Sequence, residues 1–167
     1  NFALTNEVAA SIPTKESERV SANIDAIKTM KNIMGDGRIA TPEEQAMLAK
    51  YTGWGGIASK TWDKTESKLS ELLTPEEVET AKASLTDAYY TSPSIIGAIY
   101  NGLSKIGFNG GRLLEPSAGT GRFIGAMPSN MLPSVKNWMA VELDTVSGNI
   151  AKLLYPNADV RVNSFEK

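Results

Sequence analysis

The feature that most constrains the fold is an alternation of strand-like and helix-like segments in the last third of the chain. Short apolar runs typical of buried strands occur at 112–115, 138–143 and 159–162. Segments with helical spacing of apolar residues separate these runs, at 121–127 and 145–155. Parallel strands need crossover connections that are usually helical, so this order predicts an α/β domain built on a parallel sheet.

Helical patterns also fill much of the first half of the chain. Apolar residues follow a helical period over 15–34, and two later segments, 41–44 and 74–77, both read Thr-Pro-Glu-Glu. Each of these combines a threonine N-cap, a proline at the first helical position and a glutamate that completes a capping box. We therefore expect a helical N-terminal arm over 1–88, followed by the α/β domain over 89–167.

Composition excludes several kinds of chemistry. The 167 residues include no cysteine and no histidine, which rules out disulfides, thiolate nucleophiles, imidazole bases and the usual zinc sites, and we predict no metal site. The formal net charge of −2 provides no broad basic field for nucleic acid. No apolar run approaches the roughly 18 residues of a membrane span, so we expect a cytoplasmic protein without membrane contact.

A glycine-containing turn links the first expected strand to the helix that follows it. The run Leu113–Phe123 contains Gly119 and Gly121, and glycines at such a turn let backbone N–H groups approach a ligand closely. Glu142 stands at the end of the next strand, about 20 residues later, where a carboxylate can accept both hydroxyls of a ribose. This spacing fits a dinucleotide and S-adenosylmethionine equally well.

Two features favour S-adenosylmethionine over a dinucleotide. A dinucleotide turn, G-x-G-x-x-G, has its third glycine three residues after the second, but Ile124 stands there and Gly125 comes one residue late. Glu115, at the end of the first strand, would repel a pyrophosphate but suits the ammonium and sulfonium groups of S-adenosylmethionine. The charges therefore predict S-adenosylmethionine as the cofactor.

The sequence Glu-Pro-Ser-Ala-Gly-Thr-Gly-x-Phe at 115–123 resembles the cofactor motif of the N6-adenine DNA methyltransferases, and Tyr-Thr-Ser-Pro at 90–93 is similar to an element that precedes it there. The resemblance implies a partial Rossmann-like methyltransferase fold, with its first three parallel strands preceded by the helical arm. In that family the acidic residue matched by Glu142 binds the ribose. The cofactor-binding residues that the resemblance implies are Tyr90, Thr91, Ser92, Glu115, Pro116, Ser117, Ala118, Gly119, Thr120, Gly121, Phe123, Glu142, Leu143 and Phe165.

One position departs from the family pattern, and a second likeness is narrower. Where the family often has Asp-Phe after the third strand, this chain has Ser164 and Phe165, which leaves only the phenylalanine to pack on an adenine ring. The run Tyr-Thr-Gly-Trp-Gly-Gly-Ile at 51–57 is similar to the amino-terminal region of large methylase-helicase proteins of conjugative elements and phages. That likeness implies a parent protein from a mobile element, with DNA as its target and a helicase domain in the same polypeptide.

The chain lacks the motif that would make it a complete adenine methyltransferase. In the family, an Asn- or Asp-Pro-Pro-Tyr motif holds the target amine, but all eight prolines here are isolated. We therefore expect no catalytic residue and an inactive cofactor-binding fragment, whose unpaired sheet edge favours self-association. The alternative is a non-catalytic methylase-like module that binds DNA or a helicase partner through a degenerate cofactor pocket. A protein or RNA methyltransferase also remains open.

Several of these residues have a structural interpretation beside the functional one. Trp54 among glycines is expected to anchor a turn to the core rather than to stack on a base. Tyr90 suits a core position as well as it suits a cofactor contact, and Arg122 is expected to be a solvated arginine at a helix start. Gly119 and Gly121 are also compatible with a purely structural turn.

Overall fold

A computed structural model describes residues 2–166 and divides the chain into two compact units. One unit, here called the helical unit, consists of Ala10–Tyr90. The other, the sheet unit, combines the residues up to Ala9 with the chain from Thr91 onward. The N-terminal residues join the sheet unit through backbone hydrogen bonds, because the N–H of Leu4 donates to the carbonyl of Gly125 at 2.7 Å.

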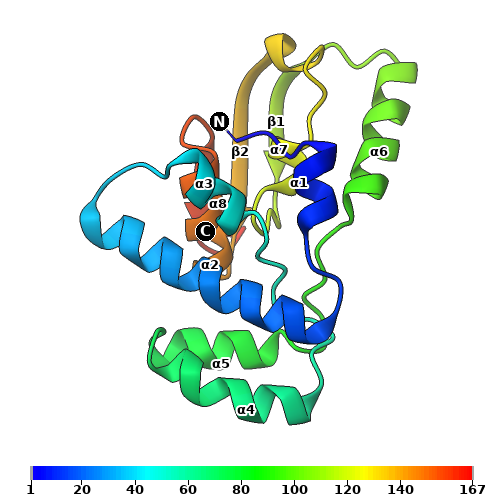
Figure 1. Cartoon of the computed structure of the whole chain (residues 1–167). Coiled ribbons are helices and arrows are strands. Elements are labelled where there is room, and N and C mark those ends of the chain that lie inside the picture. Colours follow the sequence, from blue (N-terminus) through cyan, green and yellow to red (C-terminus); the bar gives the residue numbers. More distant parts are fainter. Residues whose placement is uncertain (1, 167) are drawn as a thin grey trace. The chain divides into compact units, whose positions relative to one another are not determined.

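Three parallel strands form the sheet in the order β1-β2-β3 (Figure 1). They are β1 (Gly111–Glu115), β2 (Val135–Glu142) and β3 (Asp159–Val162). Leu113 of β1 lies opposite Trp138 of β2. The predicted α/β class and its parallel sheet are therefore confirmed.

The helices of the sheet unit cover one face of the sheet. They are α6 (Pro93–Lys105), α7 (Arg122–Gly125) and α8 (Thr145–Leu154), with a short 3-10 turn at Leu132–Ser134. On this face, Trp138 packs against the cluster formed by α6 and the segment after α7.

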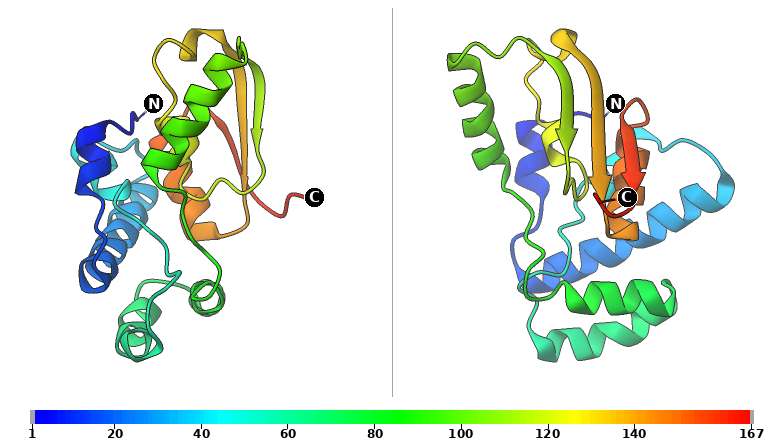
Figure 2. Two further views of the ribbon diagram at one scale, coloured as in Figure 1. Left: turned by 90° about the vertical axis from the view of Figure 1, so that its right-hand side faces the viewer. Right: turned by 180° about the vertical axis from the view of Figure 1, so that it is seen from behind.

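Contacts of α8 place it on the same face. A Cβ at Gly148 of α8 would lie 2.7 Å from Val162, which the β2–β3 register pairs with Glu142, on the Trp138 side of β2. Figure 2 (left) shows α6 and α8 on the same side of the strands. Among the described residues of this unit, the opposite face carries no helix.

The first strand is less buried than the sequence predicts. Arg112 and Leu114 alternate with half-buried residues, and Leu114 is 53% exposed. The reason is topological, since β1 pairs only with β2 among the described strands and its second face has no covering helix. The expectation of a short buried strand is therefore wrong for β1, although its position in the chain is correct.

Five helices precede α6 within the described residues: α1 (Asn6–Ser11), α2 (Glu16–Asp36), α3 (Pro42–Leu48), α4 (Ser59–Ser70) and α5 (Pro75–Ala83). The long α2 buries one face, and the side chains that it and α3 contribute to the core are Ala26, Ile27, Met30, Ile33 and Leu48. Within residues 2–166, no helix has both the length and the apolar character that crossing a membrane requires.

Both predicted capping boxes are present. The Thr41 hydroxyl accepts from the N–H of Glu44, whose carboxylate in turn accepts from the N–H of Thr41, and Thr74 and Glu77 do the same at α5. Each box satisfies two backbone donors that the first helical turn would otherwise leave without partners.

The glycine-rich loop after α3 is fastened to α2 by a buried amide. Asn23 donates from Nδ2 to the Gly53 carbonyl at 2.7 Å and accepts at Oδ1 from the N–H of Thr52 at 2.8 Å. Trp54, 2% exposed, packs edge-on against Trp62 with ring centroids 5.5 Å apart. Trp54 is thus the structural anchor that the sequence predicts.

Candidate functional site

The carboxyl ends of β1 and β2 meet at the glycine turn, and Glu142 holds that turn in place. The N–H of Gly119 donates to Glu142 Oε2 at 2.6 Å, and the N–H of Asp144 donates to Glu142 Oε1 at 2.8 Å. The N–H of Ala118 donates to the Val141 carbonyl at 3.0 Å. The N–H of Gly119 and the carboxylate of Glu142, both predicted to contact a cofactor, are therefore bonded to each other.

The second glycine of the turn makes room for a tyrosine. Gly121 has a φ of +75°, and a Cβ there would lie 2.6 Å from Cε2 of Tyr155. Gly125, one turn further along α7, faces the hydroxyl of the same tyrosine. Tyr155 is 2% exposed, and burial raises the pKa of its hydroxyl, with the nearby Glu115 adding to the effect. The packing of Tyr155 alone accounts for these two glycines.

Glu115 lies at the end of β1 as a half-buried acid. Burial, and secondarily the negative charge of Glu142, raises the pKa of its carboxyl to about 8. Its Oε2 atom is buried and has no hydrogen-bond partner among the described residues. At neutral pH this carboxyl is therefore mostly protonated.

The remaining predicted residues around the turn have structural contacts. Ala118 and Thr120 are buried within the turn itself. Phe123 contacts Tyr100 of α6, with ring centroids 6.2 Å apart, and its carbonyl accepts a 2.6 Å hydrogen bond from the tyrosine hydroxyl. These contacts join the turn to α6.

The predicted residues before α6 and after β2 and β3 lie in different surroundings. Ser92 is the N-cap of α6, and the carbonyl of Thr91 accepts from Nη1 of Arg122 at 3.3 Å. Leu143 and Phe165 have exposed side chains, at 72% and 58%.

Tyr90 belongs to the helical unit. Its ring lies directly against Gly53, where a Cβ would clash with it, and packs edge-on against Tyr51 with centroids 6.3 Å apart. These contacts give Tyr90, which is half-buried, a packing role within the helical unit, and its cofactor contact stays a prediction.

Sequence reasoning missed two residues of the site. Tyr155 is not among the predicted site residues, because the glycines that make room for it are attributed to a ligand. Arg122 was expected to be solvated, yet it is 9% exposed and donates to the Thr91 carbonyl. A bulky aromatic residue directly after α8, so close to the expected third strand, is a signal that favours burial and would have pointed to Tyr155.

A set of exposed aliphatic side chains lies on α6, at its C-cap and on the edge strand β1. We call it the open-edge surface and define it by Ile95, Ile99, Ile106 and Leu114, whose side chains are between 42% and 80% exposed. A cavity of about 250 Å³ lies beside it, between α6 and β1, and its lining is predominantly apolar. Among its lining residues is Trp138, whose buried Nε1 has no hydrogen-bond partner among the described residues.

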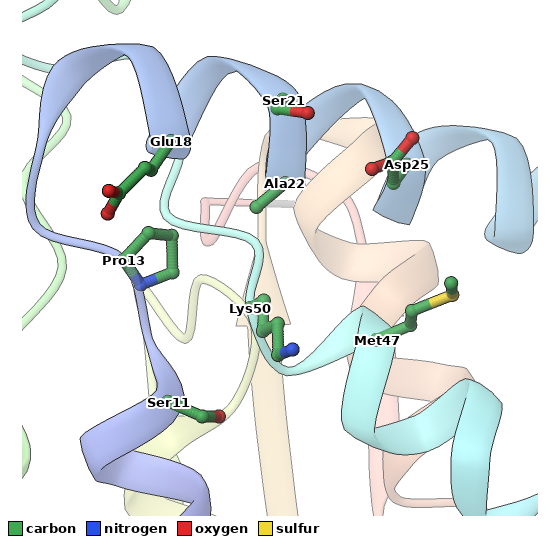
Figure 3. Close-up of a pocket in the computed structure, with 8 residues that line it drawn as sticks. All are labelled: Ser11, Pro13, Glu18, Ser21, Ala22, Asp25, Met47 and Lys50. Carbon is green, nitrogen blue, oxygen red and sulfur yellow. The ribbon is translucent and has the colours of Figure 1, made fainter.

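The helical unit contains a second hollow, of about 360 Å³ (Figure 3). Glu18 and Asp25 line it from α2, and Lys50 lines it from the segment after α3. None of the predicted site residues lies there. Across residues 2–166, no group of three or more acidic side chains is arranged to hold a metal ion.

Comparison with known proteins gives one informative match. The chain is 32% identical over 149 residues to Defense against restriction protein B of Escherichia phage P1, and the match covers 89% of this chain but 5% of that protein. No protein-family model matches the chain, and no solved structure matches it. The chain therefore corresponds to a small part of the relative it matches.

This match corrects the sequence-based identification. The resemblance to N6-adenine DNA methyltransferases, and to the methylase-like region of methylase-helicase proteins, is contradicted, because the matching protein is one of defence against restriction. The motif at 115–123 misled because a glycine turn after a strand serves a structural role as readily as a cofactor-binding one. The expected link to a mobile element agrees with the phage origin of the relative.

Proposed function

We propose that the chain is a non-catalytic, methylase-like module of a protein that protects DNA against restriction, and that it acts by binding a protein partner. The name of the phage relative supports the setting. The open-edge surface carries the proposal of partner binding. In fold terms we propose one half of a Rossmann-like sheet, since parallel strands in the order β1-β2-β3 match half of a doubly wound arrangement.

The open-edge surface is unusual for a parallel sheet. Such sheets normally have both faces covered by helices, because their strands are apolar on both sides. Here the helices of the unit lie on one face, and Leu114 on the other face is 53% exposed. Large exposed apolar patches mark interaction sites in soluble proteins, and we propose that these side chains form one.

Charge favours a protein over DNA as the partner. Binding to the phosphate backbone relies on neutralising lysines and arginines, whereas this chain has a net charge of −2. The side chains that define the open-edge surface are all aliphatic. We propose a helicase domain as this protein partner.

The geometry suits an extended segment of that partner. The main chain of β1 pairs only with β2 among the described strands, so its free side offers N–H and C=O groups to a further strand. The apolar cavity between α6 and β1 is large enough for aliphatic side chains of such a strand. In a protein as long as the relative, the rest of the polypeptide is the nearest source of this strand.

The test uses the full chain in two assays. With labelled S-adenosylmethionine and duplex DNA we expect no methyl transfer, and transfer would refute the non-catalytic part of the proposal. With a hydrophobic dye we expect binding that Ile99→Lys and Leu114→Lys each reduce severalfold. Leu132→Lys is the matched control, because Leu132 is 49% exposed in the same unit but lies outside the surface.

The partner itself is tested by sedimentation velocity with a candidate helicase domain. We expect a complex with the wild-type chain and none with Leu114→Lys. Equal dye binding by wild-type and Leu114→Lys chains would show that the open-edge surface is not an accessible apolar site.

A further inference from the structure

We infer that Glu142 is an internal clasp of the glycine turn, and that this clasp replaces a cofactor, so that the sheet unit does not use S-adenosylmethionine. The inference deepens the non-catalytic character proposed above and rests on it. It concerns the carboxyl edge of the sheet, so it is independent of the open-edge surface.

The first support is the direct contact between the two groups that a nucleoside would need. A bound ribose would require the carboxylate of Glu142 as its acceptor and space beside the turn. The N–H of Gly119 instead lies 2.6 Å from Glu142 Oε2, and the N–H of Asp144 lies 2.8 Å from Oε1, so each carboxylate oxygen already accepts a hydrogen bond from the main chain. Hydrogen bonds from backbone N–H to a carboxylate are charge-assisted and are therefore among the strong ones.

The second support is that the clasp belongs to a continuous network. Glu142 Oε1 accepts from the N–H of Asp144, and Asp144 in turn caps α8 by accepting from the N–H groups of Val146 and Ser147 at 3.3 and 3.0 Å. Glu142 thus ties the glycine turn to the start of α8. This position gives the carboxylate a structural task within the sheet unit.

The third support comes from the other residues predicted to contact the cofactor. Gly121 makes room for the buried ring of Tyr155. Glu115, predicted to face the ammonium group, is buried enough that its pKa rises to about 8, so it offers little negative charge at neutral pH. Of these two residues, Gly121 serves the packing of the chain itself, and Glu115 is held largely uncharged at neutral pH.

The experiment combines ligand titration with amide exchange on the full chain. The probes are S-adenosylmethionine and S-adenosylhomocysteine, added by calorimetric titration to millimolar concentration. Amide hydrogen exchange at Gly119 and Asp144 is followed by NMR in wild-type, Glu142→Ala and Glu142→Gln chains. The control is Glu166→Gln, an exposed acid in the same unit.

We expect no saturable binding of either probe to the wild-type chain. We also expect exchange at Gly119 and Asp144 to accelerate at least tenfold in Glu142→Ala and to a smaller extent in Glu142→Gln, with no change in the control. Saturable binding to the wild-type chain, or unchanged exchange at Gly119 in the Glu142 variants, overturns the inference. If Glu142→Ala does not fold, the titration and Glu142→Gln decide the matter. Neither result bears on dye binding at the open-edge surface, so the two proposals fail separately.

Discussion

Replacing Glu115 with glutamine should change how the stability of the protein depends on pH. The carboxyl of Glu115 has its pKa raised from 4.5 to about 8, mainly by burial. Between these two values the unfolded chain gives up the proton while the folded chain retains it. Stability is therefore greatest below pH 4.5 and decreases as the pH rises toward 8, above which the loss is constant.

The size of this effect follows from the same interval. Each pH unit between 4.5 and about 8 corresponds to about 1.4 kcal/mol, so the raised pKa of Glu115 lowers the stability of the folded state by about 5 kcal/mol at pH 9 and about 3 kcal/mol at pH 7. Glutamine has nearly the same shape but no charge to bury. Glu115→Gln should thus be more stable than the wild-type protein at high pH, with the difference shrinking to below about 1 kcal/mol at pH 5.

Urea denaturation at pH 5, 7 and 9 measures this difference directly. The comparison with Glu166→Gln, an exposed acid in the same unit, removes the contribution that any acid-to-amide change makes through net charge. We expect the stability gap between Glu115→Gln and wild type to widen with pH and the gap for the control to stay constant. A Glu115→Gln protein whose stability follows the wild-type curve at all three pH values would refute the argument.

Two further predictions concern packing in each unit. Gly121→Ala should lower the free energy of unfolding, measured by thermal denaturation, by at least about 2 kcal/mol, because it adds a clash with Tyr155 to the cost of a positive φ. Gly107→Ala is the control, because Gly107 also has a positive φ, of +83°, but a Cβ there would meet no other atom. Asn23→Ala should cost about 2–4 kcal/mol by urea denaturation, since it leaves buried backbone groups such as the Gly53 carbonyl without their partner. A cost no larger at Gly121 than at Gly107, or an Asn23→Ala loss below about 0.5 kcal/mol, would contradict these explanations.

The parts of the fold that sequence predicts well have local causes. The boxes at Thr41 and Thr74 depend on residues three apart, so the motif alone defines where α3 and α5 begin. The order of strands and crossover helices likewise follows from periodicity along the chain. The parallel sheet can be predicted without knowledge of distant contacts, from the handedness and length of its connections.

The parts that sequence predicts poorly depend on tertiary contacts. The helix α4 was missed, although Trp62, Thr65 and Leu69 lie on one face of it, because its many charged residues obscured this sparse apolar pattern. The exposure of Leu114 could not be predicted, since an apolar strand gives the same pattern whether or not a helix covers it. The site shows the same limit: Tyr155 fills the space at Gly121, and no local pattern pairs two residues so far apart.

The carboxyl edge of the sheet and the free side of β1 therefore differ in which groups they leave without partners. This difference explains why a cofactor-like motif occurs in a chain for which we propose another function. At the carboxyl edge, the donor at Gly119 and the acceptor at Glu142 satisfy each other, so the edge can persist without a ligand. Along β1, the exposed side chain of Leu114 and a main chain that pairs with β2 alone among the described strands remain, and covering them would contribute favourable free energy. We therefore propose that this module gains more from a partner at Leu114 and α6 than from a cofactor at the closed glycine turn.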